Sequence, residues 1–283
     1  MSQTTNHHHA YINDILEYLH QRRGFDSSGY RPPMLKRRIG NRLAKLNMDS
    51  HQEYFDYLKS HEDELTALQE VLTINISRFF RNTYIFEYIS KHLLPEIISK
   101  KLSSNDKIIR IWSAGCSTGE EPFSMAILLN ELIKNEYQNM RTMIIATDID
   151  EKVIQHARKG IYSSDRVGNI RHRLIKKYFI QNEDEFALSP EILKIVMFSK
   201  YDMLDKNVNS PPESIYGDFD VVLCRNLLIY FKLDSQKQIF EKLYNSLNEN
   251  GVLILGESES IIGPFKDKFL KESRLCKIFT RLN

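Results

Sequence analysis

Apolar positions in the first quarter of the chain recur with the spacing of amphipathic helices. They predict helices over residues 10–23, 34–46, 50–59 and 61–72, with breaks at 24–33 and near 47–49. From residue 108 onward, short apolar runs typical of buried strands alternate with helical segments. The strands are predicted at residues 108–113, 143–147, 194–198, 219–224, 251–256 and 276–281. The pattern therefore predicts a small all-helical domain followed by a doubly wound, Rossmann-like α/β domain.

The segment from about 160 to 199 interrupts this alternation. It carries a predicted helix over 171–178 and short strand-like pieces near 177–180 and 185–188, which indicates an inserted subdomain. We therefore predict a helical domain over 1–75, suited to substrate recognition, and an α/β domain over 76–283 that contains the insertion.

Candidate chemistry lies where the first two predicted strands end. The turn over 113–119 contains Gly115, which lets the backbone approach a ligand, and Glu120 and Glu121 open the next helix. The second strand is followed by Asp148, whose carboxylate could bind ribose hydroxyls. Two acidic residues at a helix start would repel a pyrophosphate. A cofactor with a cationic amino-acid end, such as S-adenosylmethionine, fits better, which favours a methyltransferase over a dehydrogenase.

The composition of the chain predicts the cellular compartment in which this chemistry takes place. The 283 residues are 42% hydrophobic and 27% charged, and we expect no membrane-spanning segment and no signal peptide. Cys116, Cys224 and Cys276 are odd in number and far apart, which predicts no structural disulfide and a cytoplasmic location. The histidines at 7–9 are expected in a disordered tail, and no metal site is predicted.

Six segments together resemble the CheR family, the chemotaxis-receptor glutamate methyltransferases. They are NISRFFR (75–81), WSAGCSTGEEP (112–122), ATDID (146–150), GIY (160–162), FDVVLCRNLLIYF (219–231) and LGESES (255–260). The resemblance covers roughly residues 70–283 in the family's order. It implies a helical domain, a class I methyltransferase domain that binds S-adenosylmethionine, and a small β-containing insertion. It also implies methyl transfer to glutamates of chemoreceptor cytoplasmic domains, with S-adenosylhomocysteine as the product.

This reaction needs alignment more than acid–base chemistry. A glutamate is already ionised at neutral pH, so an in-line displacement requires no general base. The resemblance makes Arg81 a substrate-site residue, where its guanidinium could hold a carboxylate by paired hydrogen bonds. Tyr230 could direct its hydroxyl at the reacting centre. The alternatives are a surface salt bridge for Arg81 and a half-buried core tyrosine for Tyr230.

The cofactor contacts follow partly from position and partly from the resemblance. Asp148 is predicted to bind the ribose, although a helix N-cap is an alternative for which Asp150 is better suited. Either Glu121, which is favoured, or Glu120 is predicted to hold the methionyl ammonium, and the sequence does not settle which of the two does so; alternatively, both merely favour the helix dipole. The complete predicted cofactor set is Asn75, Ser77, Arg81, Gly115, Glu120, Glu121, Asp148, Asp202, Met203, Arg225 and Asn226.

The surface that binds the substrate is predicted on a basic stretch over 31–45, which has six basic residues and no acidic residue. Arg38, Arg42 and Lys45 recur on one helix face, and we expect them to bind the glutamate-rich receptor bundle. A nucleic-acid surface and a plain solvated face are the alternatives. We predict a monomer that binds no nucleic acid.

The stretch 180–186 has no glycine and is acidic, whereas pentapeptide-docking members of the family carry a glycine-rich turn there. Independence of a pentapeptide tether is therefore predicted. Two other functions stay open: a methyltransferase with another acceptor, and a cofactor sensor or scaffold without turnover.

Overall fold

The computed structural model describes residues 2–73, 77–104, 106–137, 140–214 and 217–282, which form two compact units. One unit comprises Met1–Asn75 and Tyr230–Gln236, and the other comprises Ile76–Ile229 and Lys237–Asn283. The sequence prediction had assigned 230–236 to the α/β domain alone. The difference arises because this short segment pairs through backbone hydrogen bonds with residues 29–31, which lie between the first two helices of the chain.

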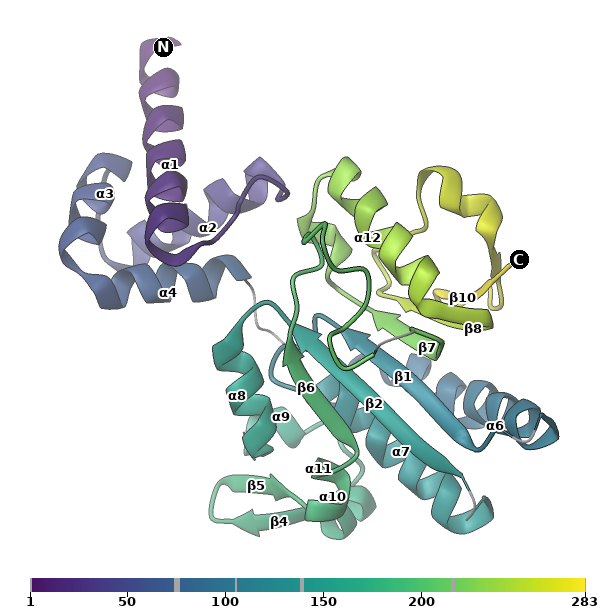
Figure 1. The fold of residues 1–283 in the computed structure, drawn as a ribbon. Coiled ribbons are helices and arrows are strands. Elements are labelled where there is room, and N and C mark those ends of the chain that lie inside the picture. Colours follow the sequence, from purple (N-terminus) through teal and green to yellow (C-terminus); the bar gives the residue numbers. More distant parts are fainter. Residues whose placement is uncertain (1, 74–76, 105, 138–139, 215–216, 283) are drawn as a thin grey trace. The chain divides into compact units, whose positions relative to one another are not determined.

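The described part of the first unit contains helices α1 (Ser2–Arg23), α2 (Pro32–Lys45), α3 (His51–Ser60) and α4 (Glu62–Thr73) (Figure 1). Ser50 caps α3, because its Oγ accepts the Glu53 N–H at 3.1 Å. The apolar positions that predicted these helices form the core, with Ile15, Leu19 and Ile39 fully buried. The prediction of a tail at 7–9 is wrong, since α1 already begins at Ser2.

The segment from Tyr230 completes this unit through an antiparallel bridge. The Arg31 N–H donates to the Tyr230 carbonyl at 2.9 Å, and the Lys232 N–H donates to the Gly29 carbonyl at 2.8 Å. Between these bonds the rings of Tyr30 and Phe231 pack with centroids 4.8 Å apart. The helical unit is therefore built from two distant parts of the sequence.

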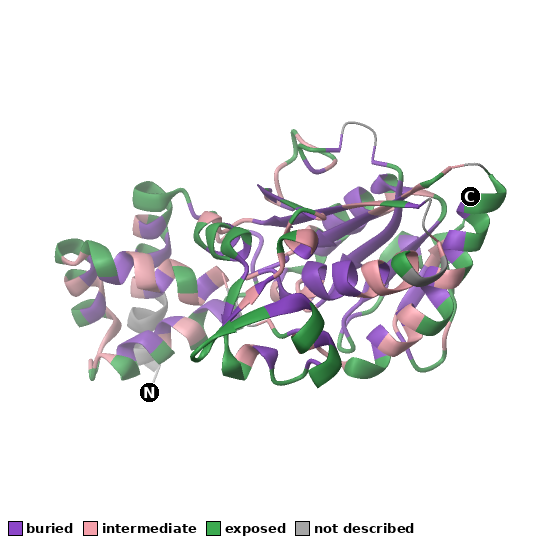
Figure 2. Cartoon of the chain, turned by 90° about the horizontal axis from the view of Figure 1, so that it is seen from below, coloured by how far each residue is buried: buried purple, intermediate pink, exposed green. Residues whose placement is uncertain are grey.

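In the second unit, the described residues form a seven-stranded sheet with the order β6-β2-β1-β7-β8-β10-β9. The first five strands are parallel neighbours, and β10 is antiparallel to both of its neighbours. Their bounds are β1 Ile108–Ala114, β2 Arg141–Asp148, β6 Val196–Lys200, β7 Phe219–Cys224, β8 Leu247–Leu255, β9 Phe269–Lys271 and β10 Ile278–Arg281. Both faces are covered, so the central strands such as β7 lie in the buried interior, whereas the edge strands β6 and β9 are partly exposed (Figure 2).

Helices surround this sheet, and α7 packs on β1, β2 and β6 (Figure 1). They are α5 Thr83–Tyr88, a π-helical turn Ile89–Leu93, α6 Leu94–Ser103, α7 Glu120–Glu136, α8 Glu151–Lys159 and α12 Leu233–Ser246. Two 3₁₀ turns span Leu228–Tyr230 and Gly263–Lys268. The predicted doubly wound class is confirmed. The strand predicted at 194–198 lies two residues later, because Pro190 starts the short helix α11 (Pro190–Leu193).

The insertion has its own small sheet in the described residues, with the order β3-β5-β4. Its elements are β3 Ile161–Ser163, α9 Ser164–Val167, α10 His172–Tyr178, β4 Phe179–Asn182, β5 Glu185–Leu188 and α11. Tyr162 anchors it, since the phenol donates to the Thr118 carbonyl at 2.7 Å in the turn after β1. The insertion is therefore tied directly to the predicted cofactor turn.

Candidate active site

The turn after β1 is pinned to the end of β2. Gly115 has a φ of +74°, which favours glycine, and its N–H donates to the Thr147 carbonyl at 2.8 Å. The Cys116 N–H donates to the same carbonyl at 2.9 Å. A Cβ on Gly115 would lie 3.1 Å from the Leu227 side chain, so the loop after β7 also packs against this turn. Three strand ends therefore meet around Gly115.

Asp148 occupies the last position of β2 and is only 9% exposed. Its carboxylate accepts the Ser117 N–H at 2.8 Å and the Asp150 N–H at 3.0 Å. Burial raises the pKa of Asp148 to about 6, although these backbone N–H groups act in the opposite direction. The expected N-cap role falls to Asp150, which accepts the Lys152 N–H at 2.9 Å and begins α8. Asp148 is thus a carboxylate held at the sheet edge.

The two glutamates at the start of α7 lie in different surroundings. Glu120 is fully buried, and its carboxylate accepts from Arg166 Nη1 at 2.9 Å and from Thr118 Oγ1 at 2.7 Å. Glu121 keeps 13% of its side chain exposed and accepts the Ser113 hydroxyl at 2.8 Å. Of these two glutamates, Glu121 is therefore the one that is partly exposed and that contacts the carboxyl end of a strand, through Ser113 of β1.

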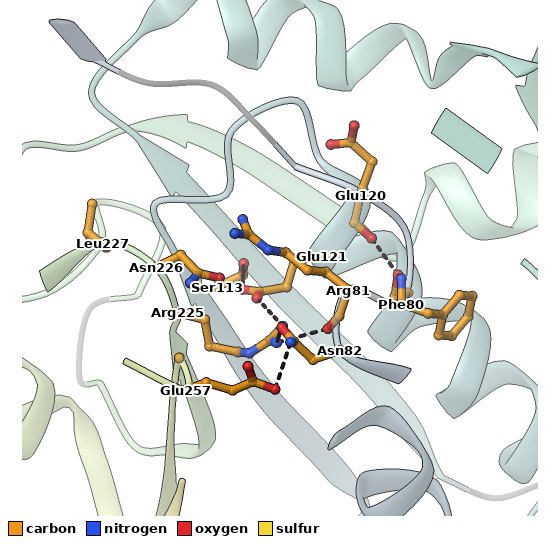
Figure 3. A network of polar contacts seen from close by, with 12 residues as sticks. Phe80, Arg81, Asn82, Ser113, Glu120, Glu121, Arg225, Asn226, Leu227 and Glu257 are labelled. Atoms are coloured by element: carbon orange, nitrogen blue, oxygen red, sulfur yellow. Dashed lines mark hydrogen bonds and ion pairs between the residues drawn. The ribbon is translucent and has the colours of Figure 1, made fainter. Parts of the chain in front are cut away.

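Arg225 organises the centre of this edge (Figure 3). Its side chain is 1% exposed, and Nη1 donates to Glu121 at 3.0 Å. Nη2 donates to the Arg81 carbonyl and to the Asn82 side-chain oxygen, both at 2.9 Å. Asn82 in turn donates to Glu257 at 2.8 Å. Arg225 therefore links the start of α7 to the segment that carries Arg81, and its guanidinium acts mainly on other protein groups.

Asn226 follows with a φ of +59°, in the left-handed region. Figure 3 shows Asn226 and the side chain of Arg81 on the same part of the sheet edge as Ser113 and Glu121. The edge thus gathers amide, guanidinium and carboxylate groups from segments far apart in the sequence.

Other predicted contacts border this edge or fall outside it. The Ser77 carbonyl accepts from Arg166 at 2.9 Å. Asp202 caps its own turn by accepting the Leu204 N–H at 2.8 Å, and Met203 is buried beside it in the loop after β6. Asn75 lies outside the described residues. The structure therefore describes Ser77, but it does not describe Asn75 of the same motif.

Tyr230 belongs to the helical unit, where its ring faces the Arg38 guanidinium at 5.4 Å from the centroid. Arg38 also donates to the Val71 and Leu72 carbonyls. The prediction of Arg38 as a substrate contact therefore needs a partial correction: Arg38 is half buried and its guanidinium is engaged within its own unit, and contact with the substrate stays a prediction.

Arg42 requires a second correction, since it is buried rather than solvent-facing. Its side chain forms an ion pair with Glu64, with Nε 2.9 Å from Oε1, and the Tyr54 hydroxyl donates to Glu64 at 2.7 Å. Lys45, by contrast, is exposed, as are Lys36 and Arg37. The helix period correctly placed Arg38 and Arg42 on one face, but that face packs inward.

Sequence reasoning missed several residues of the site. Arg166 of the insertion holds Glu120, and Asn82 joins Arg225 to Glu257, but no spacing pattern connects residues so far apart. Glu259 was visible only as part of the LGESES string.

Across the described ranges, no three His, Cys, Asp or Glu side chains gather as metal ligands would, and no helix is long and apolar enough to cross a membrane.

A parallel doubly wound sheet with β10 inserted antiparallel between β8 and β9, and with an acidic tip on β2, defines a class I methyltransferase. Comparison with family models agrees. Residues 75–275 match the "CheR methyltransferase, SAM binding domain" and residues 10–73 match the "CheR methyltransferase, all-alpha domain". The chain belongs to the CheR methyltransferase family, a family of S-adenosylmethionine-dependent enzymes of chemotaxis.

Three relatives illustrate this membership, all named chemotaxis protein methyltransferases. The protein of Borreliella burgdorferi is 30% identical over 255 residues, which cover 89% of this chain and 88% of that protein. The one of Listeria innocua is 32% identical over 241 residues, covering 85% and 86%. Chemotaxis protein methyltransferase 2 of Vibrio cholerae is 33% identical over 249 residues, covering 87% and 83%.

Proposed function

We propose that this protein transfers the methyl group of S-adenosylmethionine to glutamate side chains on the cytoplasmic domains of chemoreceptors. It acts in the cytoplasm, as a monomer and without nucleic acid. The observation that carries the proposal is the cluster of Glu121, Arg225, Asn82 and Arg81 at the carboxyl edge of a class I methyltransferase sheet. This cluster supplies fixed charges and dipoles of both signs where a charged cofactor and a carboxylate acceptor must meet.

The donor set fits S-adenosylmethionine. The Asp148 carboxylate is buried and has lone pairs beyond those that accept from Ser117 and Asp150, so it can accept from a ribose diol. Glu121 offers a partly exposed carboxylate to the methionyl ammonium, and Gly115 lets the backbone approach the ligand. Met203 is apolar and follows β6, which suits the adenine side. We assign Glu120 to pairing with Arg166 rather than to the cofactor.

The bound cofactor supplies an electrophilic methyl group on a sulfonium sulfur. The acceptor glutamate has an ordinary pKa near 4.3, so it arrives ionised and needs no general base. Arg81 would hold the acceptor carboxylate in line, and Tyr230 would assist at the reacting centre, in the roles implied by the resemblance. Arg225 acts on the reaction indirectly, because it fixes both Glu121 and the backbone of Arg81.

The test is methyl transfer from labelled S-adenosylmethionine to membranes that contain the receptors of the source organism. Label released by alkali as methanol supports glutamate methyl esters, and Arg81→Ala should abolish it. Base-stable label would assign a different acceptor. Cofactor binding without transfer to any membrane protein would instead support a sensor or scaffold and would overturn the proposal.

The receptor surface is the solvent-exposed face of α2, with Lys36, Arg37 and Lys45. No acidic residue lies in this helix, so its face complements a glutamate-rich bundle. The double reversal R37E/K45E should lower kcat/KM for receptor about tenfold or more, mainly through slower association, and more strongly at low salt.

The matched control for this surface is K176E/K266E, which changes the net charge equally at exposed lysines of the other unit. Cofactor affinity, measured by calorimetry, should be unchanged in both double variants. Equal values of kcat/KM for receptor in the two double variants would refute the proposed role of the α2 face.

We also propose that receptor recognition does not depend on a C-terminal pentapeptide. The hairpin between β4 and β5 carries Glu183, Asp184 and Glu185 at its exposed tip. These acidic residues would repel a peptide that ends in a free carboxylate. Titration calorimetry with such a peptide should give no heat of binding, and micromolar affinity would contradict this part of the proposal.

A further inference from the structure

Glu259 is a buried carboxylate that accepts four backbone N–H groups. It is 3% exposed, and Oε2 accepts from Gly256 at 2.7 Å and from Asn226 at 2.9 Å. Oε1 accepts from Leu227 at 2.8 Å and from Leu228 at 2.7 Å. Among the described residues, no ion pair includes Glu259. Its charge is therefore balanced by amide dipoles at the carboxyl ends of β7 and β8.

This arrangement requires an ionised glutamate rather than any polar residue. An ionised carboxylate has about four lone-pair sites, and the N–H groups of the described chain fill them in pairs. Burial raises the pKa of Glu259, whereas the N–H groups favour its charged form. A glutamine of the same shape would place its own N–H₂ against two of these donors.

The same carboxylate fixes a loop of the active site. Asn226 has the left-handed φ of +59°, and its N–H is one of the bonds to Glu259. Gly256 allows the close approach, because a Cβ there would lie 2.7 Å from Glu259 Oε2 and 2.8 Å from the Asn226 nitrogen. Leu227, the next residue held, packs against the Gly115 position.

We propose that Glu259 is a positioning residue of the methyltransferase. It holds Asn226 beside Arg225 and keeps Leu227 against the turn at Gly115, so that the cofactor meets a preformed edge. This inference rests on the proposed function only in assigning Asn226 and Gly115 to the cofactor site. Because Glu259 is 3% exposed and bonded to the loop backbone, its effect on the cofactor would pass through Asn226 and Leu227.

The test compares E259Q with D220N. Asp220 is also a buried carboxylate and lies on β7, the strand that precedes the Asn226 loop, but it accepts from Arg110 and Lys101 near the amino end of that strand. For each variant, calorimetry gives the Kd for S-adenosylmethionine, urea unfolding gives stability, and methyl transfer to receptor gives kcat and KM. G256A is a second route to the same defect, because its methyl group would displace the carboxylate.

We expect E259Q and G256A to raise the cofactor Kd about tenfold or more and to lower kcat as well. D220N should lose stability while keeping the wild-type Kd and kcat. Wild-type Kd values in E259Q and G256A would overturn the inference, as would losses in all three variants that follow their stability alone. Since the Kd needs no acceptor, a wild type that binds cofactor but methylates no receptor would refute the proposed function and leave this test intact.

Discussion

Replacing Asp148 by asparagine should weaken cofactor binding and, at neutral pH, stabilise the protein without cofactor. The pKa of Asp148 is about 6 in the folded protein against an ordinary value of 3.8, because burial disfavours its charge. The folded state therefore binds the proton more tightly than the unfolded chain does. Protonation of Asp148 therefore stabilises the folded state. This contribution to the free energy of unfolding is fully present below pH 3.8 and is lost as the pH rises through 6.

A shift of about 2 pKa units corresponds to about 3 kcal/mol of lost stability at pH 7. The D148N substitution removes that cost, but its N–H₂ group cannot accept the second backbone N–H that Asp148 now accepts. With about 1 kcal/mol lost for that bond, the net gain in the free energy of unfolding is about 2 kcal/mol. At pH 4 the gain should vanish, because the wild-type carboxyl is then largely protonated in the folded state.

Cofactor affinity should change in the opposite direction. Losing a charge-assisted hydrogen bond to the ribose should raise Kd about tenfold to a hundredfold at pH 7. In the wild type, Kd should also rise about fivefold between pH 6 and pH 5 as Asp148 is protonated, whereas D148N should show no such step.

Urea unfolding at pH 4 and pH 7, together with calorimetric titration of S-adenosylmethionine, measures both effects. D150N is the control, since asparagine caps a helix as well as aspartate does. Because the Asp150 carboxylate contributes to the raised pKa of Asp148, D150N should shift the pH midpoint downward but keep the wild-type Kd at pH 7. Equal Kd values for D148N and wild type at pH 7 would refute the ribose assignment.

Two further predictions concern the buried charges. R42M leaves the carboxylate partner of Arg42 buried without a cation, so urea unfolding should show a loss of about 3 kcal/mol with unchanged cofactor Kd; full stability would mean that the pair contributes nothing. E121Q should raise the calorimetric Kd for S-adenosylmethionine about tenfold or more, whereas E120Q should mainly lower stability. The reverse pattern would show that Glu120, and not Glu121, contacts the methionyl ammonium.

Much of the fold could be predicted because periodicity and burial agree. The apolar positions Phe123, Ala126, Ile127 and Leu129 predicted α7 and are all fully buried. Short or edge elements were missed. The strand β9 has only three residues, of which one is buried, so it carries no alternation that a sequence pattern could show.

The site could be predicted where one strand end determines the chemistry. Asp148 and Gly115 could be predicted to lie at the sheet edge because the loops of a doubly wound sheet gather at its carboxyl end, and the structure places both there. Arg42 was misjudged, since its burial depends on Glu64 in another helix and a basic residue without a partner is ordinarily exposed. Glu259 and Arg166 act through partners 31 to 33 and 46 residues away, a separation for which the sequence has no local signal.

The bridge between Tyr30 and Phe231 has a consequence for synthesis on the ribosome. The helices up to Thr73 leave the ribosome about 150 residues before the segment that completes their unit. At 5–20 residues per second this delay lasts roughly 8 to 30 seconds. During that time the Tyr30 ring lacks its contact with Phe231, although Phe25 still packs beside it, and the apolar surface that Phe231 covers stays open to chaperones that bind nascent chains. Expressed without residues 230–236, the helical unit should therefore be prone to aggregation, although all of its helices are present.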